Sequence, residues 1–343
     1  MEVIARRYDT GRLAKIITND VRIESVVDVN SAAVTDHSSV MAADVSWVSP
    51  GFVDLQINGY GGQEFNDLEL DSERLARLCL AMDADGVTQF LPTLTTQSFE
   101  MLSHGMRAIS TACQQDPRVQ QRVAGIHLEG PYLCDEDGPR GAHPKEHCRP
   151  PDWDEFQRLQ EAAGGNIRLL TISPEFESAP PVIRNVVNSG VVVAIGHTSA
   201  DSAQIQAAVD AGASMSTHLG NGAHRQLRRH PNYIWDQLAE DRLIASLIVD
   251  GHHLPAEVVK AFVRCKTVER CILVSDITGM AGMPPGLHEN ASLGQVEILE
   301  DGRLVVPGQR QLLAGASLPI GVGIANVMRF ADVDLASAIG MAS

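Results

Sequence analysis

Eight short apolar runs, each separated from the next by a longer amphipathic stretch, constrain the fold of this 343-residue chain more than any other feature. Between residues 52 and 277 the runs read FVDLQI, VTQFLPT, VAGIHLE, IRLLTIS, VVVAIGH, SMSTHL, IASLIVD and CILVSDI. The stretches between them follow helical spacing, and several begin at Ser or Asp and end at Gly, as capped helices do. Parallel strands that are covered on both faces have such continuous apolar runs, so the pattern predicts a (β/α)8 barrel.

The alternative architecture is an open doubly wound sheet, but neither GxGxxG nor GxxxxGK[ST] follows any of the runs. Before the first run, short β-type pieces end at Ser49, Pro50 and Gly51. This break predicts a small β subdomain over residues 1–49 and the barrel over residues 50–343. After Asp276 we expect a loop, a hairpin that turns at Asp301 and Gly302, and a helical region from Leu318 to the end.

The composition limits the partners of the chain. It has 27 Lys and Arg against 43 Asp and Glu, a net charge of -16, so its field repels nucleic acid and anionic membranes. An anionic substrate therefore needs a local positive pocket. The six cysteines form no CxxC pair, no apolar leader follows Met1, and no run is long enough to span a membrane. We expect a reduced, cytoplasmic protein with neither nucleic-acid nor membrane partners.

Polar residues interrupt the apolar runs at the ends that a (β/α)8 barrel uses for its active site. These residues are Gln56, Asn58, His127, Glu129, His197, His218, Asp250 and Asp276. One Glu and two His are suitable ligands for a divalent metal and leave a position open for water, as in hydrolytic sites. A single His at a strand end is more often structural, but several such residues on successive strands favour a metal site.

Asp276 and a cluster of arginines each have two possible interpretations. Asp276 could accept a proton from a water molecule whose pKa a metal lowers, or it could cap the loop that follows. Arg225, Arg228 and Arg229 form a positive cluster in an acidic chain, close to His218. Arginines in such a cluster suit bidentate binding of phosphate, whereas the alternative is a solvated basic loop that pairs with surface carboxylates.

Several longer motifs carry a resemblance to a known family. They are PGFVDLQINGYGG (50–62), HLEGPYL (127–133), GAHPKEH (141–147), GHTSA (196–200), THLGN (217–221), DGHH (250–253), LVSDITGMAGMPPG (273–286) and LLAGASL (312–318). In this order, over most of the chain, they resemble the N-acetylglucosamine-6-phosphate deacetylases of the amidohydrolase superfamily. The fold of that superfamily is the barrel predicted above.

The resemblance implies residue roles. Glu129, His197 and His218 would bind one divalent metal ion per subunit, with Zn²⁺ the expected ion, and Asp276 would be the general base and acid. His143 would lie near the scissile carbonyl. Substrate contacts are implied at Ala142, His143, Asn221, Gly222, Arg229, Asp250, His253, Leu313, Ala314 and Gly315. Arg229 matches the phosphate-pairing arginine of the family, which is typically supplied across a dimer interface, so the resemblance implies a homodimer.

Two details refine the resemblance. Gln56 and Asn58 stand where many amidohydrolases have an HxH pair, which resembles the members that bind one metal. The family usually reads THLFNAM, whereas this chain has Gly220, Gly222 and Ala223 in place of the aromatic residue, the Ala and the Met. That change should alter the wall of the sugar pocket.

The expected activity is metal-dependent deacetylation of an N-acetylated amino-sugar 6-phosphate, with N-acetylglucosamine-6-phosphate as the expected substrate and glucosamine-6-phosphate and acetate as products. One alternative is a related amidohydrolase that acts on another acylated sugar phosphate or small amide. The other is a catalytically silent protein that binds sugar phosphates.

Overall fold

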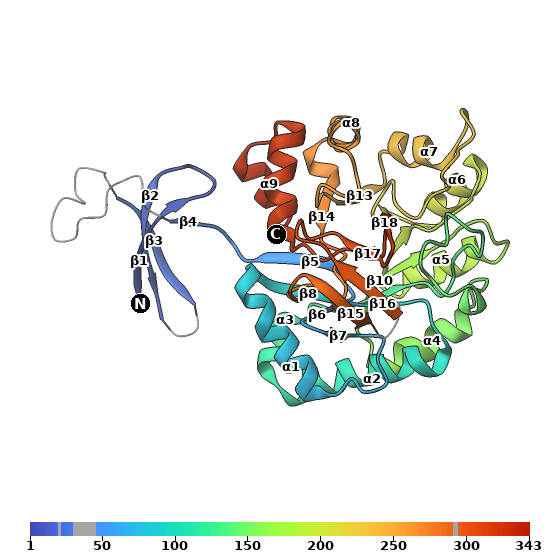
Figure 1. Ribbon diagram of the computed structural model, residues 1–343, viewed down its shortest axis with the longest axis horizontal. Coiled ribbons are helices and arrows are strands. Elements are labelled where there is room, and N and C mark those ends of the chain that lie inside the picture. Colours follow the sequence, from blue (N-terminus) through green and yellow to red (C-terminus); the bar gives the residue numbers. More distant parts are fainter. Residues whose placement is uncertain (20–21, 30–45, 291–293) are drawn as a thin grey trace.

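The computed structural model of the chain describes residues 1–19, 22–29, 46–290 and 294–343. Its centre is a parallel sheet of eight strands (Figure 1). The strands are β5 (Phe52–Ile57), β8 (Val87–Thr95), β9 (Ile126–Glu129), β10 (Ile167–Ile172), β11 (Val192–Ile195), β12 (Met215–Ser216), β13 (Ile244–Ile248) and β14 (Cys271–Val274). Each lies in one of the eight apolar runs, except that β8 continues two residues beyond VTQFLPT. The bridge between Ile57 and Ile277 joins the first strand to the end of the last, so the predicted (β/α)8 barrel is confirmed.

Helices cover the outside of this sheet. They are α1 (Ser72–Ala81), α2 (Phe99–Gln115), α3 (Pro117–Arg122), α4 (Trp153–Ala162), α5 (Ala179–Asn188), α6 (Ser202–Asp210), α7 (Tyr233–Ala239), α8 (Ala256–Lys266), α9 (Ile320–Ala331) and α10 (Leu335–Gly340), with short 3-10 turns at η2 (Met82–Asp85), η3 (Lys145–His147) and η4 (Val268–Arg270). Side-chain caps start several of them; Asp201, for example, forms a capping box with Gln204. No helix among the described residues is both long and apolar enough to cross a membrane.

The inside of the barrel is built in layers. Near the amino ends of the strands, Leu91, Leu169, Ala194 and Met215 pack together as an apolar cluster. Above them lies a fully buried polar layer, in which Thr171 Oγ1 lies 2.8 Å from His127 Nε2 and 2.7 Å from Thr217 Oγ1. Burial lowers the pKa of His127 to about 4, so this histidine is neutral. The polar layer forms a rigid floor beneath the carboxyl ends of the strands.

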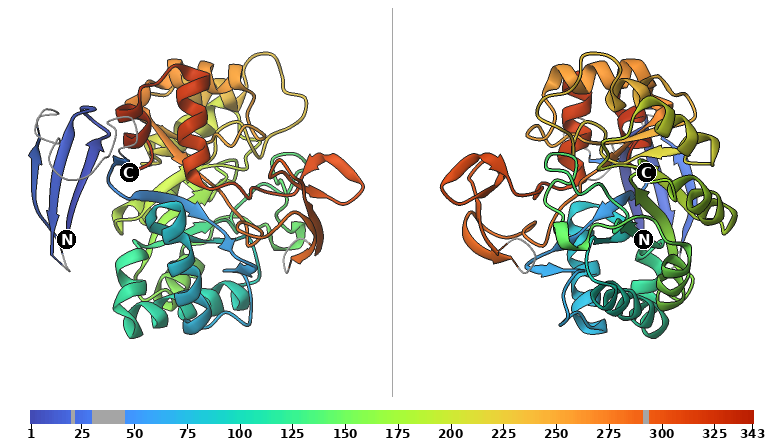
Figure 2. Two further views of the ribbon diagram at one scale, coloured as in Figure 1. Left: turned by 60° about the vertical axis from the view of Figure 1, so that its left-hand side comes forward. Right: turned by 90° about the vertical axis from the view of Figure 1, so that its right-hand side faces the viewer.

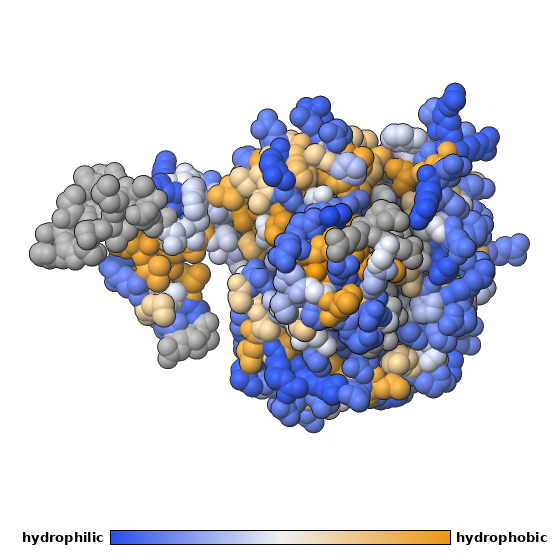
Figure 3. Space-filling model, viewed as in Figure 1, coloured by the Kyte–Doolittle hydropathy of each residue, from blue (hydrophilic) through white to orange (hydrophobic). Residues whose placement is uncertain are grey.

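Two smaller sheets flank the barrel on opposite sides (Figure 2). The amino-terminal one has the order β3 (Ile23–Asp28), β2 (Leu13–Thr18), β1 (Glu2–Arg7), β4 (Trp47–Val48), and it exposes apolar side chains such as Val26, Val27 and Ile23 (Figure 3). The division of the chain into subdomains at residue 49 stays a prediction.

The second sheet is an antiparallel extension of β15 (Gly286–Asn290), β16 (Gly294–Ile298), β17 (Leu304–Val306) and β18 (Gln309–Leu313). It contains the expected hairpin, since β16 and β17 pair on either side of Asp301 and Gly302. A short hairpin, β6 (Gly59–Tyr60) and β7 (Gln63–Glu64), follows the first barrel strand.

Candidate metal centre and active site

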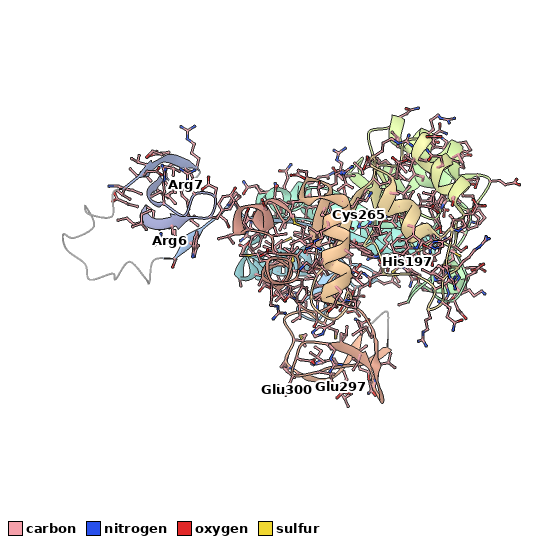
Figure 4. All side chains as sticks on the ribbon, turned by 90° about the horizontal axis from the view of Figure 1, so that it is seen from above. Arg6, Arg7, His197, Cys265, Glu297 and Glu300 are labelled. Atoms are coloured by element: carbon pink, nitrogen blue, oxygen red, sulfur yellow. The ribbon has the colours of Figure 1, made fainter. Side chains whose placement is uncertain are left out.

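A cavity of about 710 Å³ opens at the carboxyl ends of the barrel strands. Most of the predicted site residues line it: Glu129, Ala142, His143, His197, His218, Asn221, Gly222, His253, Asp276, Leu313, Ala314 and Gly315. His197 lies in the body of the barrel, apart from the small sheet that carries Arg6 and Arg7 and from the extension that carries Glu297 (Figure 4). Residues that are far apart in the sequence, from Asn58 to Gly315, thus line a single cavity.

Three of these side chains converge on a point where a metal ion would fit. Glu129 Oε1 lies 3.1 Å from His197 Nε2 and 3.0 Å from His218 Nε2, and the two Nε2 atoms are 3.1 Å apart. Donor atoms that share one tetrahedral Zn²⁺ at about 2.0–2.1 Å lie about 3.4 Å from one another, close to these values. Burial alone would raise the pKa of Glu129, but hydrogen bonds with both histidines hold it well below its ordinary value.

The surroundings of His197 orient its ring for metal binding. His197 Nδ1 lies 2.8 Å from the carbonyl oxygen of Pro139, so Nδ1 carries the hydrogen and Nε2 keeps a free lone pair. Ser173 Oγ donates to the His197 carbonyl at 2.7 Å. Thr198, the next residue, donates to Glu175 at 2.7 Å. The segment after β11 is thereby fixed from several sides.

His143 is closer to the three donors than its predicted role requires. Its Nε2 lies 3.2 Å from His197 Nε2, and donor atoms of Glu129, His143 and His197 all lie within 4.8 Å of one another. Burial, with a smaller effect of His197, lowers the pKa of His143 to about 3, so its ring is neutral. A neutral ring can donate one hydrogen bond to a substrate oxygen or offer a fourth donor to a metal.

Asp276 is a partly buried carboxylate beside this cluster. Burial, followed by the negative charge of Glu129, raises its pKa to about 6. Asn58 Nδ2 donates to Asp276 Oδ1 at 2.8 Å, and the backbone N–H of Asp276 donates to the Gln56 carbonyl at 3.0 Å. A carboxylate with a pKa near neutrality can both accept and return a proton, as a general base and acid must.

The backbone is left-handed at three of these positions. His197, His218 and Asp276 have φ values of 50°, 28° and 53°, a region that residues other than glycine rarely occupy. Each follows the end of a barrel strand by two residues, and all three line the cavity. Such backbone costs free energy and is typically found at functional sites.

The cavity also contains candidates for phosphate binding. Asp250 Oδ2 lies 2.7 Å from His253 Nδ1, which leaves His253 Nε2 for a ligand; His253 lines the cavity and Asp250 supports it. Arg225 also lines the cavity, whereas Arg228 and Arg229 are exposed and are not among its lining residues. One chain thus brings a single arginine of the cluster to its own cavity.

Part of the lining was not predicted. Glu64, Asn66, Thr95, Gln97 and Asn290 form one side of the cavity. Burial raises the pKa of Glu64 to about 7, and this carboxyl accepts from Asn290 Nδ2 and from the backbone N–H of Gly279. The polar loop after the first apolar run could have indicated Glu64 and Asn66, but no sequence signal connects Asn290 to them.

Gln56 and His127, two of the strand-end residues, do not line the cavity. His127 lies in the polar floor, where its Nδ1 is 3.4 Å from Thr93 Oγ1. Gln56 is buried, and its Nε2 donates to Glu129 Oε1 at 3.0 Å. Both support the site from behind rather than facing the cavity.

No family model matches the chain. It is 32% identical over 305 residues to the N-acetylglucosamine-6-phosphate deacetylase of Homo sapiens, covering 86% of this chain and 72% of the human one. It is 31% identical over 306 residues to the N-acetylgalactosamine-6-phosphate deacetylase of Escherichia coli O157:H7, covering 89% and 78%. The fold matches a mutant N-acetyl-D-glucosamine-6-phosphate deacetylase from Mycobacterium smegmatis, solved in complex with N-acetyl-D-glucosamine-6-phosphate, with a TM-score of 0.82 and 27% identity over 100% of this chain and 88% of that chain. With this identity, this coverage and this fold, the chain belongs to the N-acetylglucosamine-6-phosphate deacetylase family of the amidohydrolase superfamily.

Proposed function

We propose that the chain is a metal-dependent deacetylase of an N-acetylated amino-sugar 6-phosphate, with N-acetylglucosamine-6-phosphate as its substrate. The observation that carries the proposal is the convergence of Glu129, His197 and His218 within 3.1 Å, next to the partly buried carboxylate of Asp276. Relatives named for the gluco and the galacto substrate are 32% and 31% identical to this chain, so the epimer has to be decided by assay.

The donor set fits one divalent metal ion per subunit. A carboxylate oxygen and two imidazole nitrogens are the ligands that Zn²⁺ prefers, and the Pro139 carbonyl fixes the tautomer that His197 needs. When bound, such an ion activates water and polarises the amide carbonyl as a Lewis acid. We propose Zn²⁺, held by Glu129, His197 and His218.

The protein groups account for the proton transfers. Asp276 accepts a proton from the attacking water as the new C–O bond forms. It then donates that proton to the sugar nitrogen as the C–N bond breaks, which gives acetate and the free amine. The neutral ring of His143 donates to the carbonyl oxygen, which gains negative charge in the tetrahedral intermediate. Ala142 and the segment Leu313–Gly315 line the same cavity and would position the sugar.

The sugar phosphate would be held by Asn221, Gly222 and His253, which line the cavity. Asp250 orients His253. Arg229 is exposed and does not line its own chain's cavity, so we propose that it reaches the site of a second subunit in a homodimer. The proposal includes a cytoplasmic location, where the free thiols of all six cysteines would be stable.

Complementation tests the role of Arg229. In a heterodimer of Arg229→Ala and Asp276→Asn subunits, one site combines an intact Asp276 with an intact Arg229 of the other subunit. Mixing the two inactive variants should therefore restore activity. A mixture as inactive as its components, in which heterodimers have been detected, would show that Arg229 does not serve a second subunit.

Acetate release tests the function itself. Protein reconstituted with Zn²⁺ should release acetate from N-acetylglucosamine-6-phosphate much faster than from the unphosphorylated sugar, with about one metal ion per chain. Faster release from the galacto epimer or from another N-acyl group would reassign the substrate within the same chemistry. No release from any sugar in a metal-loaded sample would favour the silent, sugar-phosphate-binding alternative.

A further inference from the structure

Strand β5 and the residue directly after it carry three polar side chains at alternate positions. Asp54 and Gln56 lie on the strand, where alternate residues share a face, and Asn58 follows its last residue. Asp54 accepts the backbone N–H of Ser275, directly before Asp276, at 3.2 Å. Gln56 and Asn58 each donate to one carboxylate of the site. We infer that Gln56 and Asn58 are positioning residues for the proposed deacetylation, and that each side-chain amide holds one reacting-site carboxylate in its working orientation.

Gln56 acts on the metal-binding carboxylate. It is 1% exposed, and its Nε2 donates at 3.0 Å to Glu129 Oε1, the oxygen that also faces both histidine donors. An amide nitrogen has no free lone pair, so it fixes this oxygen without itself binding the ion. Outer partners of this kind govern how well a ligand is oriented and therefore how tightly a metal binds.

Asn58 acts on the proton-transferring carboxylate. Its Nδ2 donates to Asp276 Oδ1 at 2.8 Å and approaches the Asp276 backbone carbonyl at 3.4 Å. The reverse orientation of the amide would place its oxygen against these two oxygens, so Asp276 selects the orientation. With Oδ1 occupied, Oδ2 of Asp276 is left to exchange the proton.

The energetic cost of this arrangement favours a functional role. Asn58 Oδ1 is buried and has no hydrogen-bond partner among the described residues, which is unfavourable for folding. Two carboxylates, Glu129 and Asp276, also share one buried site, where they repel each other. Neutral amide donors stabilise both charges without adding a third, and one short stretch of chain, the end of β5 and the residue after it, supplies both donors.

Two variants of Asn58 test whether its side-chain amide positions Asp276. Asn58→Asp keeps the shape but replaces the donor with a carboxylate, and Asn58→Ala removes the donor. We expect both to lower kcat about ten- to a hundredfold with little change in KM. Because the donor favours ionised Asp276, its loss should move the acid limb of the kcat profile to higher pH, and further for Asn58→Asp.

The matched control for Asn58 is Asn326→Asp. Asn326 is a buried asparagine, 8% exposed, that donates to the Val249 carbonyl at 2.9 Å. This change should lower stability without moving the acid limb. A wild-type kcat and pH profile in Asn58→Asp would overturn the role of Asn58.

Metal affinity tests the part of Gln56 without any turnover. Gln56→Met preserves length and removes the donor, so competition with a chelator should show Zn²⁺ binding about ten- to a hundredfold weaker. The control is Gln237→Met, since Gln237 is 3% exposed and donates to the Tyr233 carbonyl at 3.0 Å, away from the site. Equal Zn²⁺ affinities of wild type and Gln56→Met would refute this role. Because no substrate is used, this result is independent of whether the deacetylase proposal holds.

Discussion

Replacing Asp276 with Asn should make the metal-free protein more stable while nearly abolishing turnover. Burial and the charge of Glu129 raise the Asp276 pKa from 3.8 to about 6, so the folded protein holds this proton more tightly than the unfolded chain does. Ionisation of Asp276 therefore does not lower the free energy of unfolding below about pH 4. Above about pH 6 it lowers the free energy of unfolding by its full amount. At about 1.4 kcal/mol per pKa unit, that cost is about 3 kcal/mol at pH 8.

The amide in Asp276→Asn has the same shape and can still accept from Asn58 through its oxygen, but it carries no charge and cannot accept a proton. We expect the metal-stripped variant to gain up to about 3 kcal/mol at pH 8 and almost nothing at pH 4. Turnover of the metal-loaded variant should fall by about 10²- to 10⁴-fold, the usual contribution of a general acid–base group. Metal content should not change, because Glu129, His197 and His218 remain.

Urea unfolding of metal-stripped protein at several pH values measures the stability. Acetate release measures the turnover, and metal analysis measures the metal content. Asp154→Asn is the control, because Asp154 is an exposed carboxylate of α4 and its loss should change stability by less than about 0.5 kcal/mol. A variant of Asp276 that is no more stable than wild type at pH 8 would refute the electrostatic reasoning. A near-wild-type rate would refute its role in proton transfer.

Three further predictions concern the polar layer beneath the site, the metal and the phosphate contact. Thr171→Val keeps the side-chain volume but leaves His127 Nε2 and Thr217 Oγ1 without their hydrogen-bond partner. The free energy of unfolding, measured by urea titration, should therefore fall by about 2–5 kcal/mol. A loss below about 0.5 kcal/mol would contradict this. Removal of metal by a chelator should abolish turnover and lower the melting temperature. Adding back Zn²⁺ at about a thousand times its Kd should restore about 4 kcal/mol of stability. A melting temperature that does not change on adding Zn²⁺ would count against the metal site. Arg229→Ala should lower kcat/KM about a hundredfold or more on the phosphorylated sugar and hardly at all on the unphosphorylated one, whereas equal losses on both would rule out a phosphate contact.

The barrel was predictable because burial on both faces leaves a direct record in the sequence. Each of the eight apolar runs coincides with a strand, although β8 extends beyond its run, and the capped stretches between them contain helices. Some runs are longer than the strands within them. In SMSTHL, for example, only Met215–Ser216 forms a strand. There the chain turns at left-handed His218 to face the cavity, and apolar character alone does not reveal where hydrogen bonding to the neighbouring strands stops.

The candidate site was predictable only where it follows the strands. Glu129, His197, His218 and Asp276 are each within two residues of a strand end, so the barrel geometry brings them together. His143, Glu64 and Asn290 reach the cavity from loops and from the β15–β18 extension, whose paths depend on tertiary packing. A single sequence also does not reveal that Arg225 lines the cavity whereas Arg229 does not.

The left-handed backbone at His197, His218 and Asp276 has a consequence for directed evolution. Glycine tolerates this conformation better than histidine or aspartate do, and at position 276 either glycine or asparagine would also remove a partly buried charge. At His197 and His218 a replacement would instead lose a metal ligand and the stability that the bound ion adds. A library of this protein that is selected only for heat resistance should therefore enrich inactive chains with a replacement at position 276. Selection for thermostability will need a simultaneous screen for acetate release, or it will remove the general base first.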